Sequence, residues 1–228
     1  MELLLDTANL IAIKKGVDYL PLAGVTSNPS IIKREGKIDF FEHMRTIRSI
    51  IGKERSLHIQ VVATEYEQML ADAKRIITEI DPEVYIKVPV NQTGLKVIKE
   101  LKRQGIKVTA TAIYTEFQGY LAIASGADYL APYFNRMENA NIDAKQIITN
   151  LAKEIQRTQQ NSKILAASFK NIGQANAAIQ AGAQALTLGV DVVEQAFSMP
   201  SIQQAITDFT NDWEETFGKG QSIYQLKD

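Results

Sequence analysis

The chain has 228 residues, of which 45% are hydrophobic and 22% charged, with 25 basic against 26 acidic side chains. This composition is that of an ordinary globular protein and excludes a disordered tail, a collagen-like repeat or a coiled-coil rod. The formal net charge of −1 supplies no basic field, so we expect neither nucleic acid nor a membrane surface as a partner.

Eight short strand-like runs alternate along the chain with amphipathic helical segments. In the helical segments, which include residues 65–80, 93–104, 143–156 and 172–181, apolar residues recur at spacings of three and four. The strand-like runs cover residues 2–6, 24–28, 57–62, 84–90, 107–113, 128–134, 163–169 and 185–189. Alternating strands and helices predict a parallel sheet, and eight such units predict an α/β fold with a single (β/α)8 TIM barrel.

We expect this barrel to be the only domain, covering residues 1–228. An open doubly wound sheet is the alternative, and the absence of a G-x-G-x-x-G motif and of a P-loop weighs against it. An extra C-terminal helix is expected at about residues 200–217. Its Trp213 and Phe217, four positions apart, are spaced to cover either the barrel bottom or a neighbouring subunit.

The residue types in the sequence limit the covalent links, metal sites and nucleophiles that the protein can have. The sequence has no cysteine, which excludes disulfides, thiolate metal sites and a cysteine nucleophile. Its two histidines, His43 and His58, match no metal-binding spacing, so we expect no metal ligands, and we expect His43 on the surface. The first ten residues, MELLLDTANL, lack the apolar run of a signal peptide, which predicts a cytoplasmic protein.

Lys87 is the most informative polar residue. It lies inside the run VYIKVPV, where a central barrel strand is ordinarily apolar. Burial disfavours an ammonium, lowers its pKa and leaves a neutral amine, which is a nucleophile for carbonyl carbons. The alternative is a structural lysine that reaches solvent or pairs with a carboxylate such as Asp6. In barrels, reactive groups lie where the strands end, which favours the catalytic interpretation.

Other polar residues near the strand ends have two interpretations each. Asp6 is either a helix N-cap or a proton-transfer carboxylate near Lys87. Asn28 precedes Pro29 and suits a cap, whereas Gln60 has the parity of an inward side chain whose amide must be hydrogen-bonded. Tyr133 fills the sixth strand or serves the site.

The positions of three further lysines in their strands predict their surroundings. Lys170, which closes the seventh strand, suits contact with an anion rather than covalent work. Lys107 and Lys163 open their strands, so we expect them at the opposite, solvated end of the barrel.

Five motifs in order carry a resemblance to a known family. They are LLDTAN at residues 4–9, AGVTSNPS at 23–30, YIKVPV at 85–90, APYFNR at 131–136 and LAASFK at 165–170. Over residues 1 to about 217 the chain resembles the small-subunit transaldolase family, closest to its fructose-6-phosphate aldolase branch. The resemblance implies a (β/α)8 enzyme that uses a fourth-strand lysine as a Schiff-base nucleophile, with no metal or organic cofactor.

The resemblance assigns roles to particular residues. Lys87 takes the place of the Schiff-base lysine, and Asp6 assists proton transfer. Thr26 and Asn28 line the donor end, while Ser168 and Arg136 hold the sugar phosphate. Lys170 is a neighbour of that phosphate. The implied partners are small sugar phosphates, and the implied assembly is a homo-oligomer, a pentamer or decamer, with the C-terminal helix reaching a neighbour.

Three positions separate the two branches of the family. Transaldolases resemble one another in having Glu, Phe and Ser where this chain has Gln60, Tyr133 and Ala131, the aldolase-like set. The resemblance implies that Gln60, Thr111 and Tyr133 act with a water in reversible cleavage of fructose 6-phosphate to dihydroxyacetone and glyceraldehyde 3-phosphate. Thr109 departs from the Asn that transaldolases carry for the donor hydroxyls.

Three alternative functions stand beside the aldolase. The first is a transaldolase, which passes the dihydroxyacetone unit from fructose 6-phosphate or sedoheptulose 7-phosphate to an aldose phosphate. The second is a barrel that binds sugar phosphates without catalysis, and the third is a metal-dependent aldolase, which the histidine count disfavours.

Overall fold

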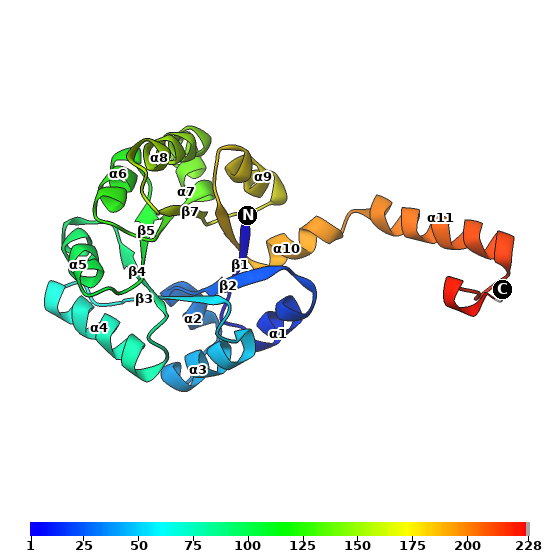
Figure 1. The fold of residues 1–228 in the computed structure, drawn as a ribbon, viewed down its shortest axis with the longest axis horizontal. Helices are drawn as coiled ribbons and strands as arrows, with labels where there is room; N and C mark the ends of the chain where they lie inside the picture. The colour runs from blue at the N-terminus through cyan, green and yellow to red at the C-terminus, as the bar shows by residue number, and fades with distance from the viewer. Residues whose placement is uncertain (227–228) are drawn as a thin grey trace.

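Eight parallel strands close into a barrel in chain order in the computed structural model, which describes residues 1–226 (Figure 1). The strands are β1 (Glu2–Asp6), β2 (Leu22–Thr26), β3 (Ser56–Gln60), β4 (Tyr85–Pro89), β5 (Val108–Ile113), β6 (Tyr129–Pro132), β7 (Lys163–Ala166) and β8 (Ala185–Leu188). This arrangement confirms the predicted (β/α)8 barrel.

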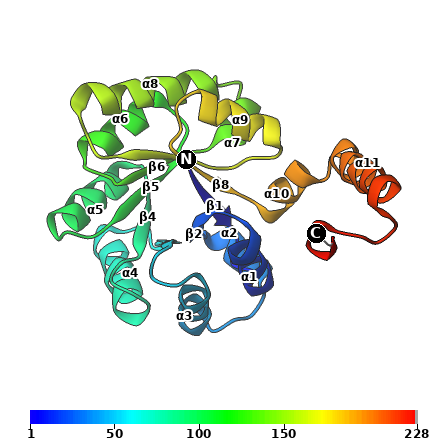
Figure 2. The same ribbon diagram turned by 45° about the vertical axis from the view of Figure 1, so that its right-hand side comes forward.

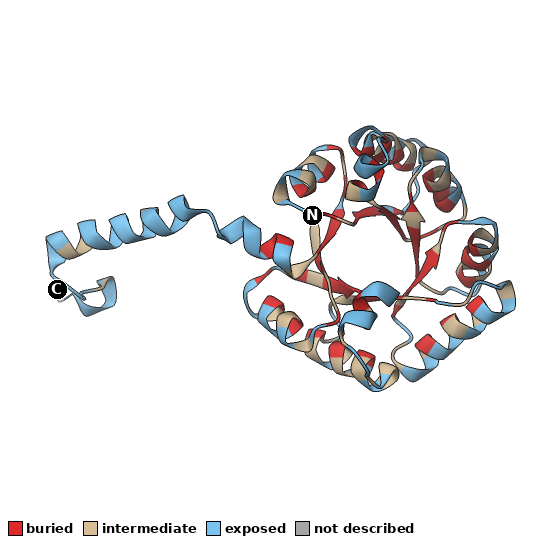
Figure 3. Cartoon of the chain, turned by 180° about the vertical axis from the view of Figure 1, so that it is seen from behind, coloured by how far each residue is buried: buried red, intermediate tan, exposed pale blue. Residues whose placement is uncertain are grey.

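Helices surround the barrel and cover its outer face. They are α1 (Leu10–Tyr19), α2 (Pro29–Arg34), α3 (Phe40–Ile51), α4 (Tyr66–Glu79), α5 (Gln92–Arg103), α6 (Glu116–Ala124), α7 (Phe134–Asn139), α8 (Ala144–Thr158), α9 (Ile172–Gln180) and α10 (Val190–Phe197). Their apolar sides face the strands and are buried, while their outer sides are exposed (Figure 3). Ile86 and Val88 of β4 are fully buried beneath this layer, as the apolar pattern of a parallel strand requires.

Four predicted strands, those corresponding to β2, β3, β6 and β7, extend two or three residues too far at their C-terminal ends. Strand β2 ends at Thr26, because the Asn28 side chain accepts a hydrogen bond from the Ile31 N–H and caps α2. Strand β6 ends at Pro132 and strand β7 at Ala166. After β7, Ser168 adopts a φ of 63° and turns the chain out of the sheet. The polar residues that follow these strands therefore lie in loops at the mouth of the barrel.

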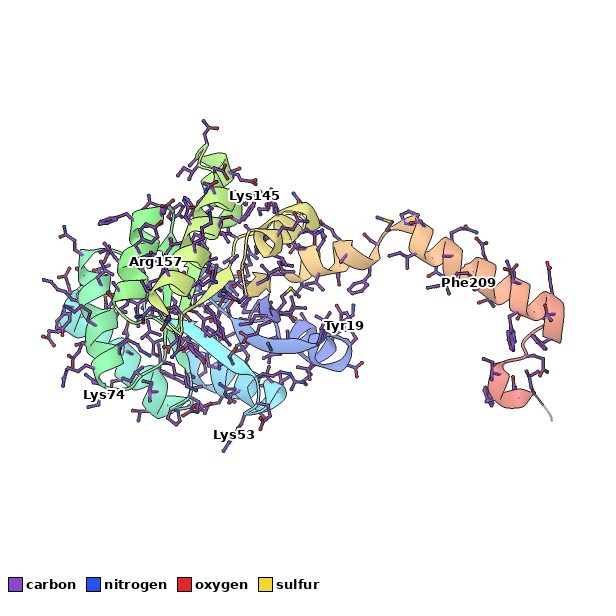
Figure 4. All side chains as sticks on the ribbon, turned by 45° about the horizontal axis from the view of Figure 1, so that its top comes forward. Tyr19, Lys53, Lys74, Lys145, Arg157 and Phe209 are labelled. Atoms are coloured by element: carbon purple, nitrogen blue, oxygen red, sulfur yellow. The ribbon has the colours of Figure 1, made fainter. Side chains whose placement is uncertain are left out.

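Helix α11 (Pro200–Phe217) extends away from the barrel as an arm, followed by a short 3-10 turn at Ile223–Gln225 (Figures 1 and 2). No residue of α11 is buried, and Figure 4 shows Phe209 on the arm, far from the barrel. The rings of Trp213 and Phe217 contact each other at 4.2 Å between centroids. The helix therefore forms where it was predicted, and the alternative in which it covers the bottom of its own barrel is wrong.

No helix within residues 1–226 combines the length and the apolar character needed to cross a bilayer.

Candidate active site

Lys87 lies within the barrel and is almost completely buried. Its side chain is 3% exposed, and its Cα is in register with Gln60 on β3 and Thr109 on β5. Burial lowers the pKa of the Lys87 ammonium, and the nearby Asp6 carboxylate opposes that shift only in part. Among the residues that the structure describes, Lys87 forms no ion pair, so the alternatives of a solvent-seeking lysine and of a salt bridge to Asp6 are both wrong.

Asp6 is held by hydroxyl groups from neighbouring strands. The Thr26 hydroxyl donates to Asp6 Oδ1 at 2.6 Å, and Thr26 Oγ1 also lies 2.6 Å from Thr187 Oγ1. Because a carboxylate only accepts and Thr26 has one proton, Thr187 must be the donor in the second bond. The N-cap of α1 is Asn9, so the capping interpretation of Asp6 is wrong and its carboxylate faces the cavity that holds Lys87.

A hydroxyl pair lies across the barrel from Asp6. Thr111 Oγ1 and the Tyr133 hydroxyl are 3.0 Å apart. Burial raises the pKa of the Tyr133 phenol, opposed by the Thr111 hydrogen bond and the charge of Arg136, so Tyr133 is protonated at neutral pH. Gln60 is in register with Lys87 on the neighbouring strand, and its buried Oε1 has no hydrogen-bond partner within residues 1–226. An orphaned acceptor of this kind suits a hydroxyl donor from a ligand.

A cavity of about 370 Å³ opens above Lys87 at the C-terminal end of the strands. Six of the nine predicted site residues line it: Asp6, Asn28, Lys87, Tyr133, Arg136 and Ser168. Thr26 and Thr111 are fully buried behind this lining. Gln60 instead lines a neighbouring apolar cavity of about 480 Å³ between α2, α3 and α4, which shares Asn28 with the first.

The rim of the Lys87 cavity is basic. The Arg136 guanidinium donates to the Tyr114 hydroxyl at 3.0 Å and lies over the Tyr133 ring at 4.8 Å, contacts that fix its position. Ser168 and Lys170 face the same cavity from the loop after β7. Arg34 also lines it, although it was not predicted from the sequence: it ends a helix, whereas the predicted site residues lie near the ends of strands.

One smaller expectation, that of His43 on the surface, is corrected by a contact outside this cavity. The His43 ring is half-buried rather than on the open surface, with Nε2 2.7 Å from the Ala8 carbonyl oxygen. Within residues 1–226, no three His, Asp or Glu side chains converge as metal ligands would.

The fold and the lysine-centred cavity are those of a barrel enzyme, and comparison with known proteins gives its family. The family model described as transaldolase/fructose-6-phosphate aldolase matches residues 3–225, so the chain belongs to this family. A relative in Streptococcus pneumoniae (strain ATCC 700669 / Spain 23F-1), called a probable fructose-6-phosphate aldolase, is 56% identical over 213 residues. The match covers 93% of this chain and 96% of the relative. These comparisons confirm the resemblance found in the motifs.

Proposed function

We propose that this protein is a Schiff-base aldolase that reversibly cleaves fructose 6-phosphate to dihydroxyacetone and glyceraldehyde 3-phosphate. The observation that carries the proposal is Lys87, a buried amine with a lowered pKa at the floor of a cavity with a basic rim. Family membership and the 56% identical relative called a probable fructose-6-phosphate aldolase support it.

Lys87 begins the reaction as the nucleophile. Its neutral Nζ adds to the C2 carbonyl carbon of the ketose, and the carbinolamine loses water to give an iminium. Asp6, aligned by the Thr26 hydroxyl at 2.6 Å, assists the proton transfers of this step. The iminium is the electron sink for the next step.

Cleavage requires a base at the C4 hydroxyl. As that hydroxyl loses its proton, the C3–C4 bond breaks, its electron pair forms an enamine, and the aldehyde phosphate leaves. We assign this proton to the group formed by Tyr133, Thr111 and Gln60, acting with a water. The same group returns a proton to the enamine carbon, and hydrolysis of the resulting iminium releases dihydroxyacetone and Lys87.

Binding residues place the substrate across this machinery. Thr26 and Asn28 serve the dihydroxyacetone end, and Arg136 and Ser168 hold the phosphate. Binding energy from the remote phosphate positions the reacting carbons. Lys170 shares the rim and adds positive charge.

Two measurements test the proposal. Borohydride added with fructose 6-phosphate should fix a three-carbon unit on Lys87, detected by peptide mass spectrometry, and Lys87→Met should abolish both adduct and activity. Fructose 6-phosphate should be cleaved without an added aldose; a strict requirement for that acceptor would instead identify a transaldolase. Full activity in Lys87→Met would end the Schiff-base mechanism.

The proposal extends to assembly and location. Large apolar side chains on the arm are exposed, Phe209 at 71%, which supports association of the arm with another copy of the chain. We propose a cytoplasmic homo-oligomer, a pentamer or decamer, serving carbohydrate metabolism and the sugar phosphates of the pentose phosphate route. Sedimentation at several concentrations tests the assembly, and a monomer throughout would refute it.

A further inference from the structure

Cations face one another across the mouth of the Lys87 cavity. Arg136 and Lys170 come from the segments that follow β6 and β7, whereas Arg34 comes from the last turn of α2, which follows β2. In a closed barrel of eight strands in chain order, β2 and β6 are four strands apart and therefore lie opposite each other. The cavity thus has a guanidinium on each of two opposing walls.

The charges of this rim match a phosphate. Apart from Lys87 and Asp6 at the floor, the cavity is lined by three cations, Arg34, Arg136 and Lys170, and one anion, Asp191. Three positive charges and one negative charge leave two positive charges. A phosphate monoester carries about −1.5 to −2 at neutral pH, so the rim neutralises one phosphate group.

The Arg34 side chain is exposed to solvent. Within residues 1–226 it takes part in no ion pair, although eight other basic side chains do. Arg136, in contrast, is anchored by the Tyr114 hydroxyl and the Tyr133 ring. An arginine without a protein partner on the wall of a basic cavity retains its planar fork of donors for an anion.

We propose that Arg34 is a substrate-binding residue that grips the phosphate from the wall opposite Arg136 and makes the site select phosphorylated aldehydes. This inference rests on the proposed aldolase function and adds a determinant of its acceptor specificity. The phosphate is bridged between α2 and the loops after β6 and β7. An aldehyde without phosphate leaves Arg34 unused.

The test compares two acceptors in the direction of synthesis, with dihydroxyacetone as donor. For Arg34→Gln, the KM for glyceraldehyde 3-phosphate should rise about tenfold to a hundredfold, which is the effect expected from losing one charge-assisted hydrogen bond. The KM for unphosphorylated glyceraldehyde should not change. Arg34→Lys should lie between, because it keeps the charge and loses the fork.

Lys33→Gln is the matched control. Lys33 precedes Arg34 on α2 and is also an exposed cation, but it lines the neighbouring apolar cavity. If Arg34 acts only through general surface charge, the two glutamine variants will raise the KM for the phosphorylated aldehyde equally, which overturns the inference. An unchanged KM in Arg34→Gln overturns it as well.

A binding measurement separates this inference from the proposed function. Calorimetric titration with inorganic phosphate should show weaker binding to Arg34→Gln than to the wild type and to Lys33→Gln. Equal phosphate binding by all three proteins would refute the role of Arg34. Failure of the wild type to form the Lys87 adduct would refute the aldolase mechanism and leave the phosphate result standing.

Discussion

His58 is a fully buried imidazole beneath the candidate active site, and it should make the protein sensitive to acid. The ring stacks on Tyr85 at 4.6 Å and meets the edge of Tyr129 at 5.2 Å between centroids. Burial holds the pKa of His58 well below its usual range, and the charges of Lys87 and Arg48 lower it further. The folded protein therefore keeps this imidazole neutral.

The hydrogen bonds of His58 also require the neutral form. The Ser56 hydroxyl donates to the Ala23 carbonyl oxygen at 3.3 Å, so Ser56 Oγ must accept from His58 Nε2 at 2.9 Å. Nδ1 is then the acceptor for the Thr109 hydroxyl at 2.8 Å. A second proton on the ring would replace this acceptor with a donor and break the bond to Thr109.

Because the folded and unfolded states bind protons differently at His58, the free energy of unfolding depends on pH. Below about pH 6.5, the usual pKa of histidine, the His58 imidazole is protonated in the unfolded chain but stays neutral in the folded protein. The free energy of unfolding therefore falls as pH falls. Between the unfolded pKa and the lowered folded pKa, the loss approaches about 1.4 kcal/mol per pH unit. The contribution is complete above the unfolded pKa and declines until the pH reaches the lowered pKa of the folded protein.

Urea unfolding from pH 5 to pH 7.5, at one protein concentration, measures this slope. Carboxylates also titrate near the lower end, so the informative quantity is the difference between the wild type and a variant without the imidazole. His58→Phe and His58→Gln differ in packing and in stability at pH 7.5, yet both should lose the same acid-dependent component. An unchanged slope in both variants would show that His58 is not the source of the acid sensitivity.

Three further predictions concern Lys87, Tyr133 and Gly94. Because the reacting Lys87 amine must be neutral and burial lowers its pKa, kcat/KM should rise with pH through a midpoint below 10.5, the usual value for lysine; a midpoint at or above that value would contradict the desolvation argument. Tyr133→Phe should reduce kcat about a hundredfold to ten-thousandfold while borohydride still traps the adduct on Lys87, and wild-type kcat would exclude the phenol as the proton carrier. Gly94→Ala should lower the free energy of unfolding, measured by urea unfolding, by about 1–3 kcal/mol. The reason is that the added Cβ would lie 1.8 Å from the Pro89 carbonyl oxygen. Stability equal to wild type would show that the backbone moves to accommodate the methyl group.

The sequence allowed the barrel to be predicted because the alternation of apolar strands and amphipathic helices is a repeated, local signal. Lys87 could be singled out for the same reason, since a lysine inside an apolar strand departs from the surrounding pattern. The ends of β2 and β7 could not be placed, because capping by Asn28 and the left-handed φ of Ser168 are decided at single residues. The place of Arg34 in the site could not be predicted for a different reason: Arg34 reaches the cavity through the packing of α2 against the barrel.

The layers of side chains inside the barrel separate Lys87 from the charged groups at the lower end of the barrel. Successive inward positions on a strand are two residues apart, so Tyr85 lies one layer below Lys87 on β4, stacked on His58. Lower still, the Tyr129 hydroxyl donates to Glu2 at 2.6 Å, and Lys163 forms an ion pair with Glu2 at the bottom of the barrel. The charged groups of the lower end therefore lie beyond an aromatic layer that excludes water from beneath Lys87. Since the amine is desolvated from below, we expect a carbonyl to reach it through the cavity at the strand ends, past the basic rim.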